Sequence, residues 1–282
     1  MNVALCNEVV RDLDLARQAA FAASLGYDGL ELAPFTLDPD APHRLDAARV
    51  RAARRAIEGE GLVVSGLHWL LVAPKGLSVT DPAPDVAART AEAVRSMIEL
   101  CAELGGRYLI HGSPAQRSLT DGQEEVGRAR ALEHFALAAD AAAAAGVEYL
   151  LEPLSRDQTG FVNTLDEASA IVDRVASPAF AAMLDCCSAA RAESRSIPEL
   201  LAAHVPTGLV RHVHFNDPNL RGPGQGELDF APVVRCLAEL DYGGWIGVEP
   251  FEYVPDGPAC AARAIGAVRA LEHAVDGPRS AP

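Results

Sequence analysis

Several features that would assign this chain to a common protein class are missing from its sequence. It has no block rich in lysine and arginine, and its formal net charge is -15, which disfavours nucleic acid or anionic membranes as partners of the whole surface. No stretch approaches the roughly 20 apolar residues of a membrane-spanning helix. The start, Met1 to Cys6, shows neither the charged region nor the cleavage site of a secretory signal. We therefore expect a cytoplasmic protein without a nucleic-acid or membrane partner.

Two further absences concern cysteine patterns and phosphate loops. The six cysteines form no paired framework and no C-x-x-C motif, so we expect reduced thiols. The residues after the first apolar run, Asn-Glu-Val-Val at 7–10, are not a glycine-rich phosphate loop, which argues against a doubly wound open sheet. No linker divides the 282 residues, and 49% apolar content suffices for one large core.

What the sequence does contain is a repeated alternation of strand-like and helix-like segments. Apolar residues recur at the helical period in the intervening segments, as from Val86 to Leu104. Glycines that would end helices stand at positions 26, 105 and 146. Capping-box patterns that predict helix starts begin at Thr120, Thr164 and Ser196. The predicted strands are Asn2–Cys6, Gly29–Leu32, Leu62–His68, Arg107–His111, Val147–Glu152, Phe180–Asp185, Leu209–His214 and Trp245–Glu249.

Eight β/α units with short turns predict an α/β fold of one domain, a (β/α)8 TIM barrel. We expect this barrel to span residues 1–275 and residues 276–282 to form a flexible C-terminal tail.

Four ionisable residues stand at the ends of four consecutive predicted strands. They are Glu152 in Leu-Leu-Glu-Pro, Asp185 in Met-Leu-Asp, His214 in His-Val-His and Glu249 in Gly-Val-Glu-Pro. The carboxyl ends of the strands in a β/α barrel meet at one mouth, so four such side chains can surround a single ion. Three carboxylates and one imidazole favour Mn²⁺, with Mg²⁺ or Co²⁺ as alternatives, whereas structural Zn²⁺ would normally bring cysteines.

Other residues are candidates for the wall of a substrate pocket. His212 lies on the same strand face as His214, so spacing alone does not separate them as ligands; we prefer His214 because it is nearer the strand end. Trp69 is expected to pack in the core rather than to stack on a ligand. Ser113, Gln116 and Arg117 are expected to form a polar rim, with binding of a phosphate or carboxylate as the alternative. Residues at or near the ends of predicted strands 1 to 4 that could line the pocket are Glu8, Glu31, His68 and His111. For His68 and His111, the alternative is a histidine of the core or rim that does not contact substrate.

With these residues in place, the chain resembles the sugar phosphate isomerase/epimerase superfamily, the xylose isomerase-like TIM barrels that include ketose 3-epimerases. The most specific stretches are His-Val-His-Phe-Asn-Asp from residue 212, Gly-Pro-Gly-Gln-Gly-Glu-Leu-Asp-Phe from residue 222 and Tyr-Gly-Gly-Trp-Ile-Gly-Val-Glu-Pro from residue 242.

The resemblance implies roles for the residues already singled out. Glu152, Asp185, His214 and Glu249 would bind the metal, and Glu152 and Glu249 would also be the catalytic acid/base pair. Arg221 would contact a substrate hydroxyl, His212 would be a further substrate contact, and the protein would be a homo-oligomer of two or four chains. Members of the superfamily act on small sugars or sugar derivatives.

The implied reaction is isomerisation or epimerisation, in which a proton is abstracted next to a carbonyl through a metal-stabilised enediolate. One departure concerns Ser188, which stands three residues after Asp185 where ketose 3-epimerases commonly have a substrate-binding histidine. Its hydroxyl is shorter and does not titrate near neutrality, so we expect different contacts at that end of the substrate. The alternatives are a metal-dependent lyase or dehydratase acting on a keto-sugar, keto-inositol or 3-keto glycoside, and a non-catalytic partner subunit.

Overall fold

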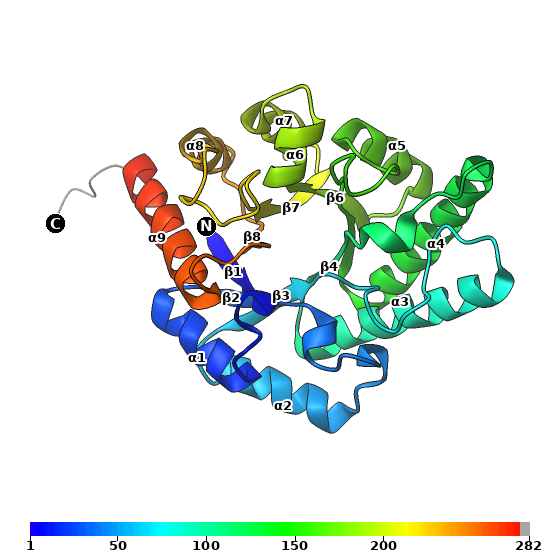
Figure 1. Cartoon of the computed structure of the whole chain (residues 1–282), viewed down its shortest axis with the longest axis horizontal. Helices are drawn as coiled ribbons and strands as arrows, with labels where there is room; N and C mark the ends of the chain where they lie inside the picture. The colour runs from blue at the N-terminus through cyan, green and yellow to red at the C-terminus, as the bar shows by residue number, and fades with distance from the viewer. Residues whose placement is uncertain (277–282) are drawn as a thin grey trace.

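The computed structural model describes residues 1–276 and shows a closed barrel of eight parallel strands in sequence order (Figure 1). Every predicted strand is present, and its bounds differ from the prediction by at most one residue at either end. The TIM barrel prediction is therefore confirmed. The expected tail, residues 276–282, lies outside the described residues except for Asp276. The strands are β1 (Asn2–Cys6), β2 (Gly29–Leu32), β3 (Val63–Leu67), β4 (Tyr108–His111), β5 (Glu148–Leu151), β6 (Phe180–Asp185), β7 (Val210–Phe215) and β8 (Trp245–Val248).

Helices form the outer ring around these strands, as Figure 1 shows. Within residues 1–276, none of them is long and apolar enough to cross a membrane. The α-helices are α1 (Leu15–Leu25), α2 (Ala47–Glu58), α3 (Pro84–Leu104), α4 (Glu124–Ala145), α5 (Leu165–Val175), α6 (Cys186–Ala192), α7 (Ile197–His204), α8 (Ala231–Glu239) and α9 (Gly257–Asp276). Short 3-10 turns are η1 (Asn7–Val10), η2 (Pro34–Thr36), η3 (Pro42–Arg44) and η4 (Pro114–Arg117).

Most of the predicted helix boundaries are confirmed by backbone geometry. The glycines at positions 26, 105 and 146 end α1, α3 and α4 in the left-handed conformation. Ser196 forms the complete capping box with Glu199 at the start of α7. Thr164 caps α5 by accepting a hydrogen bond from the backbone N–H of Glu167.

The predicted helix start at Thr120 is wrong. The backbone N–H of Gln123 donates to the carbonyl of Thr120 at 2.9 Å, so these residues form a turn. Gly122 has a φ of 77°, which this turn requires and which a helical residue would not adopt. Helix α4 begins only at Glu124. The Asp-Gly pair therefore directs a turn here, although the four-residue pattern also fits a capping box.

Strand side chains alternate between the helix layer and the barrel interior. The outward side chains pack with the helices in the main core. A second cluster, formed by Tyr108, Ile110, Leu150, Ala181 and Met183 with Trp245 against it, fills the interior. This interior cluster therefore closes the barrel below the mouth at the carboxyl ends of the strands. All six cysteines are free thiols, as predicted.

Candidate metal centre and active site

The four residues predicted at the ends of strands 5 to 8 meet at one mouth of the barrel. One ligand atom each from Glu152, Asp185, His214 and Glu249 lies within 4.8 Å of the other three. All four side chains are buried. Their convergence follows from the topology, because β5 to β8 are neighbours in the closed barrel and Asp185 pairs in register with His214.

The atoms that face the centre of this quartet suit a divalent cation. His214 Nδ1 lies 2.9 Å from Glu249 Oε2 and 3.9 Å from Glu152 Oε1. Among residues 1–276, neither His214 Nδ1 nor Glu249 Oε2 has a hydrogen-bond partner, although both atoms are buried. Buried polar atoms normally have partners, and three oxygen ligands with one nitrogen are a usual donor set for Mn²⁺ or Mg²⁺. The residues present therefore fit the implied metal, and their role as its ligands stays a prediction.

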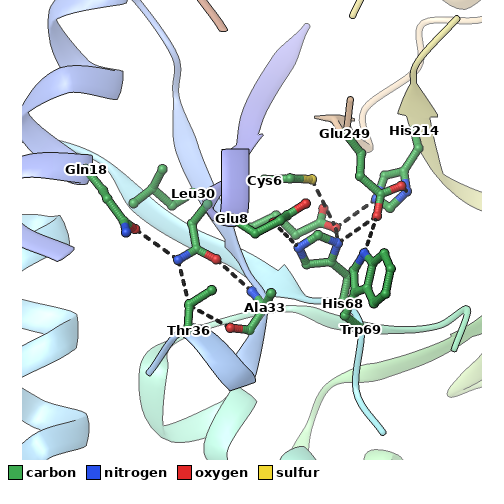
Figure 2. A network of polar contacts seen from close by, with 12 residues as sticks. Cys6, Glu8, Gln18, Leu30, Ala33, Thr36, His68, Trp69, His214 and Glu249 are labelled. Atoms are coloured by element: carbon green, nitrogen blue, oxygen red, sulfur yellow. Dashed lines mark hydrogen bonds and ion pairs between the residues drawn. The ribbon is translucent and has the colours of Figure 1, made fainter. Parts of the chain in front are cut away.

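Glu249, directly after β8, is held in place by the loop that follows β3. Its Oε1 accepts hydrogen bonds from Trp69 Nε1 at 2.9 Å and from His68 Nδ1 at 3.1 Å. Figure 2 shows His68 between Glu8 and Glu249, with the indole of Trp69 beside it. Burial raises the pKa of Glu249, but the nearby charge of His214, together with the hydrogen bond and charge of His68, outweighs it and lowers the pKa to about 2. This carboxylate is therefore ionised across the neutral range.

Glu152, directly after β5, has a different environment. Within residues 1–276 no side chain or backbone group donates a hydrogen bond to its carboxylate; its main-chain carbonyl accepts from Arg117 Nη1 at 2.7 Å. A side chain on Gly112 would overlap Glu152 Oε2, so this glycine leaves the space that the carboxylate occupies. Burial and the nearby charge of Glu249 raise the pKa of Glu152 to about 8.

Asp185, the last residue of β6, is positioned through both of its oxygens. Oδ1 accepts from the backbone N–H of Ser188 and Oδ2 from Asn216 Nδ2, each at 2.6 Å. Asn216 also contacts the carbonyl of Glu249 at 3.2 Å, so one amide links two of the quartet. Burial and the charge of Glu249 raise the pKa of Asp185, and His214 opposes this shift.

Comparison with known proteins identifies the family of this chain. A family model described as a xylose isomerase-like TIM barrel matches residues 19–271. The chain belongs to this family.

Named relatives lie among sugar epimerases. An L-ribulose 3-epimerase of Methylomonas sp. is 29% identical over 84% of this chain and 78% of its own length. A probable ketose 3-epimerase of Synechocystis sp. is 25% identical over 81% of this chain and 75% of its own. The solved structure of 3-keto-D-glucoside 4-epimerase from E. coli shares the fold, with a TM-score of 0.81 at 19% identity over 96% of this chain and 99% of that one.

The quartet of this xylose isomerase-like barrel borders a cavity of about 230 Å³. Glu152, Glu249 and His68 line it. Its polar wall also includes Ser113 and Gln158. Apolar side chains form the rest of the wall, and they are Trp69, Pro114, Leu154, Leu220 and Phe251. A ligand in this cavity would therefore contact both ionisable groups and a largely apolar wall.

The structure separates the two histidines of β7, which sequence spacing left together. His214 joins the quartet, whereas His212 lies deeper in the barrel, where its ring packs on Tyr108 with centroids 4.4 Å apart. Glu31 lies beside it, 3.1 Å from His212 Nε2, and both side chains are 0% exposed. The expectation that His212 and Glu31 line the pocket is wrong, because they occupy the layer below it.

His111 is also misplaced by the prediction. Tyr108 and Ile110 face the barrel interior, so alternation along β4 turns His111 outward. There its Nδ1 lies 2.7 Å from the hydroxyl of Tyr149, and its ring packs edge to face on Phe135 of α4. His111 therefore belongs to the contact between barrel and helices, and the predicted substrate contact is wrong.

Three further candidates lie close to the quartet without forming the cavity wall. Glu8 Oε2 is 3.0 Å from His68 Nε2, so Glu8 supports His68 from behind. Ser188 is buried in the first turn of α6, and within the described chain its Oγ has no partner. It does not line the cavity, so its contact with substrate stays a prediction. Arg221 is half-buried beside Leu220, which does line the cavity, and its contact with substrate stays a prediction.

The loop after β4 was expected to form a polar rim or, alternatively, to bind a phosphate or carboxylate, and its residues lie in different places. Ser113 lines the cavity, in agreement with a rim. Arg117 is 0% exposed and its guanidinium contacts the carbonyl of Glu152, so it neither forms the rim nor reaches a substrate phosphate. Burial lowers the pKa of Arg117 to about 10.

The contacts of Asn216 and Trp69 with the quartet were not among the predictions. A signal for Asn216 exists, because residues 212, 214 and 216 share one face of β7 and its continuation. Trp69 was expected in the core, but it is half-buried and its N–H binds Glu249. No local pattern predicts that contact, since 180 positions separate the two residues.

Proposed function

We propose that this protein is a divalent-metal-dependent isomerase or epimerase of a sugar or sugar derivative. The observation that carries the proposal is the buried quartet of three carboxylates and one imidazole at the edge of a cavity. The family membership and the epimerases among its relatives support the same class of reaction. The ion proposed is Mn²⁺, with Mg²⁺ or Co²⁺ as alternatives.

The chemistry proposed for the site is proton transfer next to a carbonyl. A divalent cation held by Glu152, Asp185, His214 and Glu249 would polarise the carbonyl of the substrate and make the adjacent C–H more acidic. Glu152 and Glu249 border the cavity and are the bases that remove and return the proton. Because no donor among residues 1–276 binds the carboxylate of Glu152, the oxygen that does not hold the cation is available for this transfer.

The remaining groups of the site orient these carboxylates and exclude water. His68 and Trp69 hold Oε1 of Glu249, which leaves Oε2 directed toward the centre of the quartet. Trp69, Leu220 and Phe251 add apolar surface to the cavity wall that Glu152 and Glu249 share. Exclusion of water by such a wall strengthens electrostatic interactions inside the site and protects a reactive intermediate. The proposed partner is a small sugar or sugar derivative, and the cytoplasmic location and assembly into dimers or tetramers stay predictions.

Hydrogen exchange tests the proposal. The purified protein is reconstituted with Mn²⁺ and incubated in deuterated water with ketoses, keto-sugar acids and 3-keto glycosides, and the products are followed by NMR and mass spectrometry. We expect deuterium at a carbon next to the carbonyl, an unchanged skeleton, and loss of exchange when a chelator removes the metal. Glu148→Gln serves as a matched control, because Glu148 lies at the opposite end of β5 and pairs with Arg211.

Other outcomes would reassign the protein. Loss of water or of an aglycone would establish the lyase alternative. Failure of the wild type to bind one Mn²⁺ per chain would overturn the proposal and favour a non-catalytic subunit.

A further inference from the structure

A carboxylate in the barrel interior lies against the quartet on the side away from the cavity. Glu31 of β2 is 0% exposed, and its Oε1 is 2.8 Å from His214 Nε2. Its Oε2 accepts a hydrogen bond from the hydroxyl of Tyr108 at 2.6 Å and lies 3.1 Å from His212 Nε2. Both oxygens are therefore fixed by groups of the barrel interior, and one of them reaches a residue of the quartet.

The strands around this pair are built to leave room for it. A Cβ on Gly247 of β8 would lie 2.7 Å from Cδ2 of His214 and 3.0 Å from Oε2 of Glu31. Real Cβ atoms do not approach heavy atoms that closely, so β8 admits the pair only because it has glycine here. The register between β2 and β3 also shifts between Leu30 and Glu31. The contact between Glu31 and His214 is thus supported by two other strands.

The two ring nitrogens of His214 face different groups. Nε2 faces Glu31, whereas Nδ1 faces Glu249 Oε2 and Glu152 Oε1 at the centre of the quartet. An ionised carboxylate only accepts hydrogen bonds, so the nitrogen that faces Glu31 must be the donor. The lone pair of a neutral imidazole then lies on Nδ1, which is the nitrogen directed at the proposed metal.

We propose that Glu31 is a positioning residue that holds His214 with Nε2 protonated and Nδ1 directed to the metal. This inference rests on the proposed function, because it assigns to Glu31 the orientation of one ligand of that site. Carboxylates that accept from the second nitrogen of a metal-bound histidine fix the tautomer and the ring plane, and their loss typically weakens metal affinity by about 10–100-fold. Tyr108 supports the same arrangement by holding the second oxygen of Glu31.

Titration calorimetry with Mn²⁺ on the full chain tests the inference. We expect Glu31→Gln to weaken Mn²⁺ binding by about 10–100-fold, since glutamine keeps the shape but not the charge that orients the imidazole. Glu148→Gln, the matched control at the far end of β5, should leave the Kd unchanged. Equal Kd values for wild type and a folded Glu31→Gln protein would overturn the role of Glu31, whereas a wild type that binds no Mn²⁺ would overturn the proposed function itself.

The tautomer of His214 gives a readout that a merely structural role of Glu31 would not change. In the Mg²⁺-loaded, ¹⁵N-labelled wild type, long-range proton–nitrogen NMR spectra should show a proton on Nε2 and none on Nδ1 of His214. A proton on Nδ1 would contradict the inference. Because this measurement uses the wild type, a proton on Nδ1 would overturn the inference even if Glu31→Gln does not fold.

Discussion

Glu152 and Glu249 have the same residue type and the same position after a barrel strand, yet their surroundings differ. On the β8 side, His68 and Trp69 donate to Glu249, and His214 lies 2.9 Å from its other oxygen. On the β5 side, the described chain offers no donor to the carboxylate of Glu152. The difference arises in the loops, because the end of β3 supplies two N–H groups while the end of β4 supplies Gly112. Two glutamates at equivalent positions after barrel strands therefore differ in their hydrogen-bond environment.

This contrast separates the protonation of the two groups. The pKa of Glu249 is lowered to about 2 and that of Glu152 is raised to about 8, so the metal-free site at neutral pH has one ionised and one protonated glutamate. Binding of a cation to Glu152 must release a proton, whereas Glu249 is already charged. Glu249 is thus the more preorganised metal ligand, and Glu152 is the group more readily switched between acid and base.

The largest expected effect is loss of activity when either carboxylate is removed. Glu152→Gln and Glu249→Gln should each lower kcat by roughly 10²–10⁴-fold, because each removes a general base. The two variants should differ in Mn²⁺ affinity, with the greater loss for Glu249→Gln, since only this substitution removes a charge already present at pH 7. Steady-state kinetics and calorimetry measure the two quantities.

Equal losses of Mn²⁺ affinity would break the comparison between the two glutamates. A double variant with wild-type turnover would go further and exclude both as the acid/base pair. Circular dichroism of each variant shows whether the fold is retained.

An intermediate effect is expected on the stability of the metal-free protein. A carboxyl whose pKa is raised in the folded state opposes folding when ionised, and for Glu152 this penalty grows as pH rises from about 4.5 to beyond 8. A lowered pKa does the reverse, so Glu249 contributes stability that is present above about 4.5 and lost as pH falls toward 2. At pH 9 in chelator, Glu152→Gln should therefore raise Tm and Glu249→Gln should lower it.

Each change at pH 9 should be about 2–4 °C for a change on the order of 1 kcal/mol in a chain of this size. At pH 4 the gain from Glu152→Gln should vanish, because Glu152 is then protonated in the folded state and largely so in the unfolded state. Scanning calorimetry in chelator at both pH values measures this. Shifts of the same sign for the two variants at pH 9 would contradict the assigned environments.

Much of the fold and the quartet could be predicted because the signals are local. Apolar runs and glycine helix ends locate each strand, and the convergence of strand ends in a barrel requires no knowledge of loops. The same argument brought Glu152, Asp185, His214 and Glu249 together. Alternation along a strand, however, does not say which face is inside, and His111 was misplaced for that reason.

The depth of a residue in the barrel and its cross-barrel partners were beyond prediction from sequence. His212 and His214 share a face, and only the stagger of the closed sheet puts one at the mouth and the other beside Tyr108. The contact of Glu31 with His214 joins residues 183 positions apart. Arg117 was expected at a polar rim but is fully buried. Its guanidinium binds the main-chain carbonyl of Glu152 rather than a charged group.

The smallest expected effect comes from removing one hydrogen-bond donor of Glu249. Trp69→Phe removes the N–H that binds Glu249 Oε1 and keeps an aromatic ring between Phe35 and Phe251. Loss of one hydrogen bond to a charged group should lower kcat/KM by roughly tenfold, about 1.4 kcal/mol. His68 still holds the same oxygen, so the carboxylate remains near its position.

A double-mutant cycle on Mn²⁺ affinity shows through which glutamate Trp69 acts. The effect of Trp69→Phe on the Kd for Mn²⁺ should shrink in a Glu249→Gln background, because the two residues are in contact, and should keep its full size in a Glu152→Gln background. Equal coupling to both glutamates would mean that Trp69 acts through the shape of the cavity. Selective coupling to Glu249 would mean that the loop after β3, rather than the barrel end itself, makes the two carboxylates different.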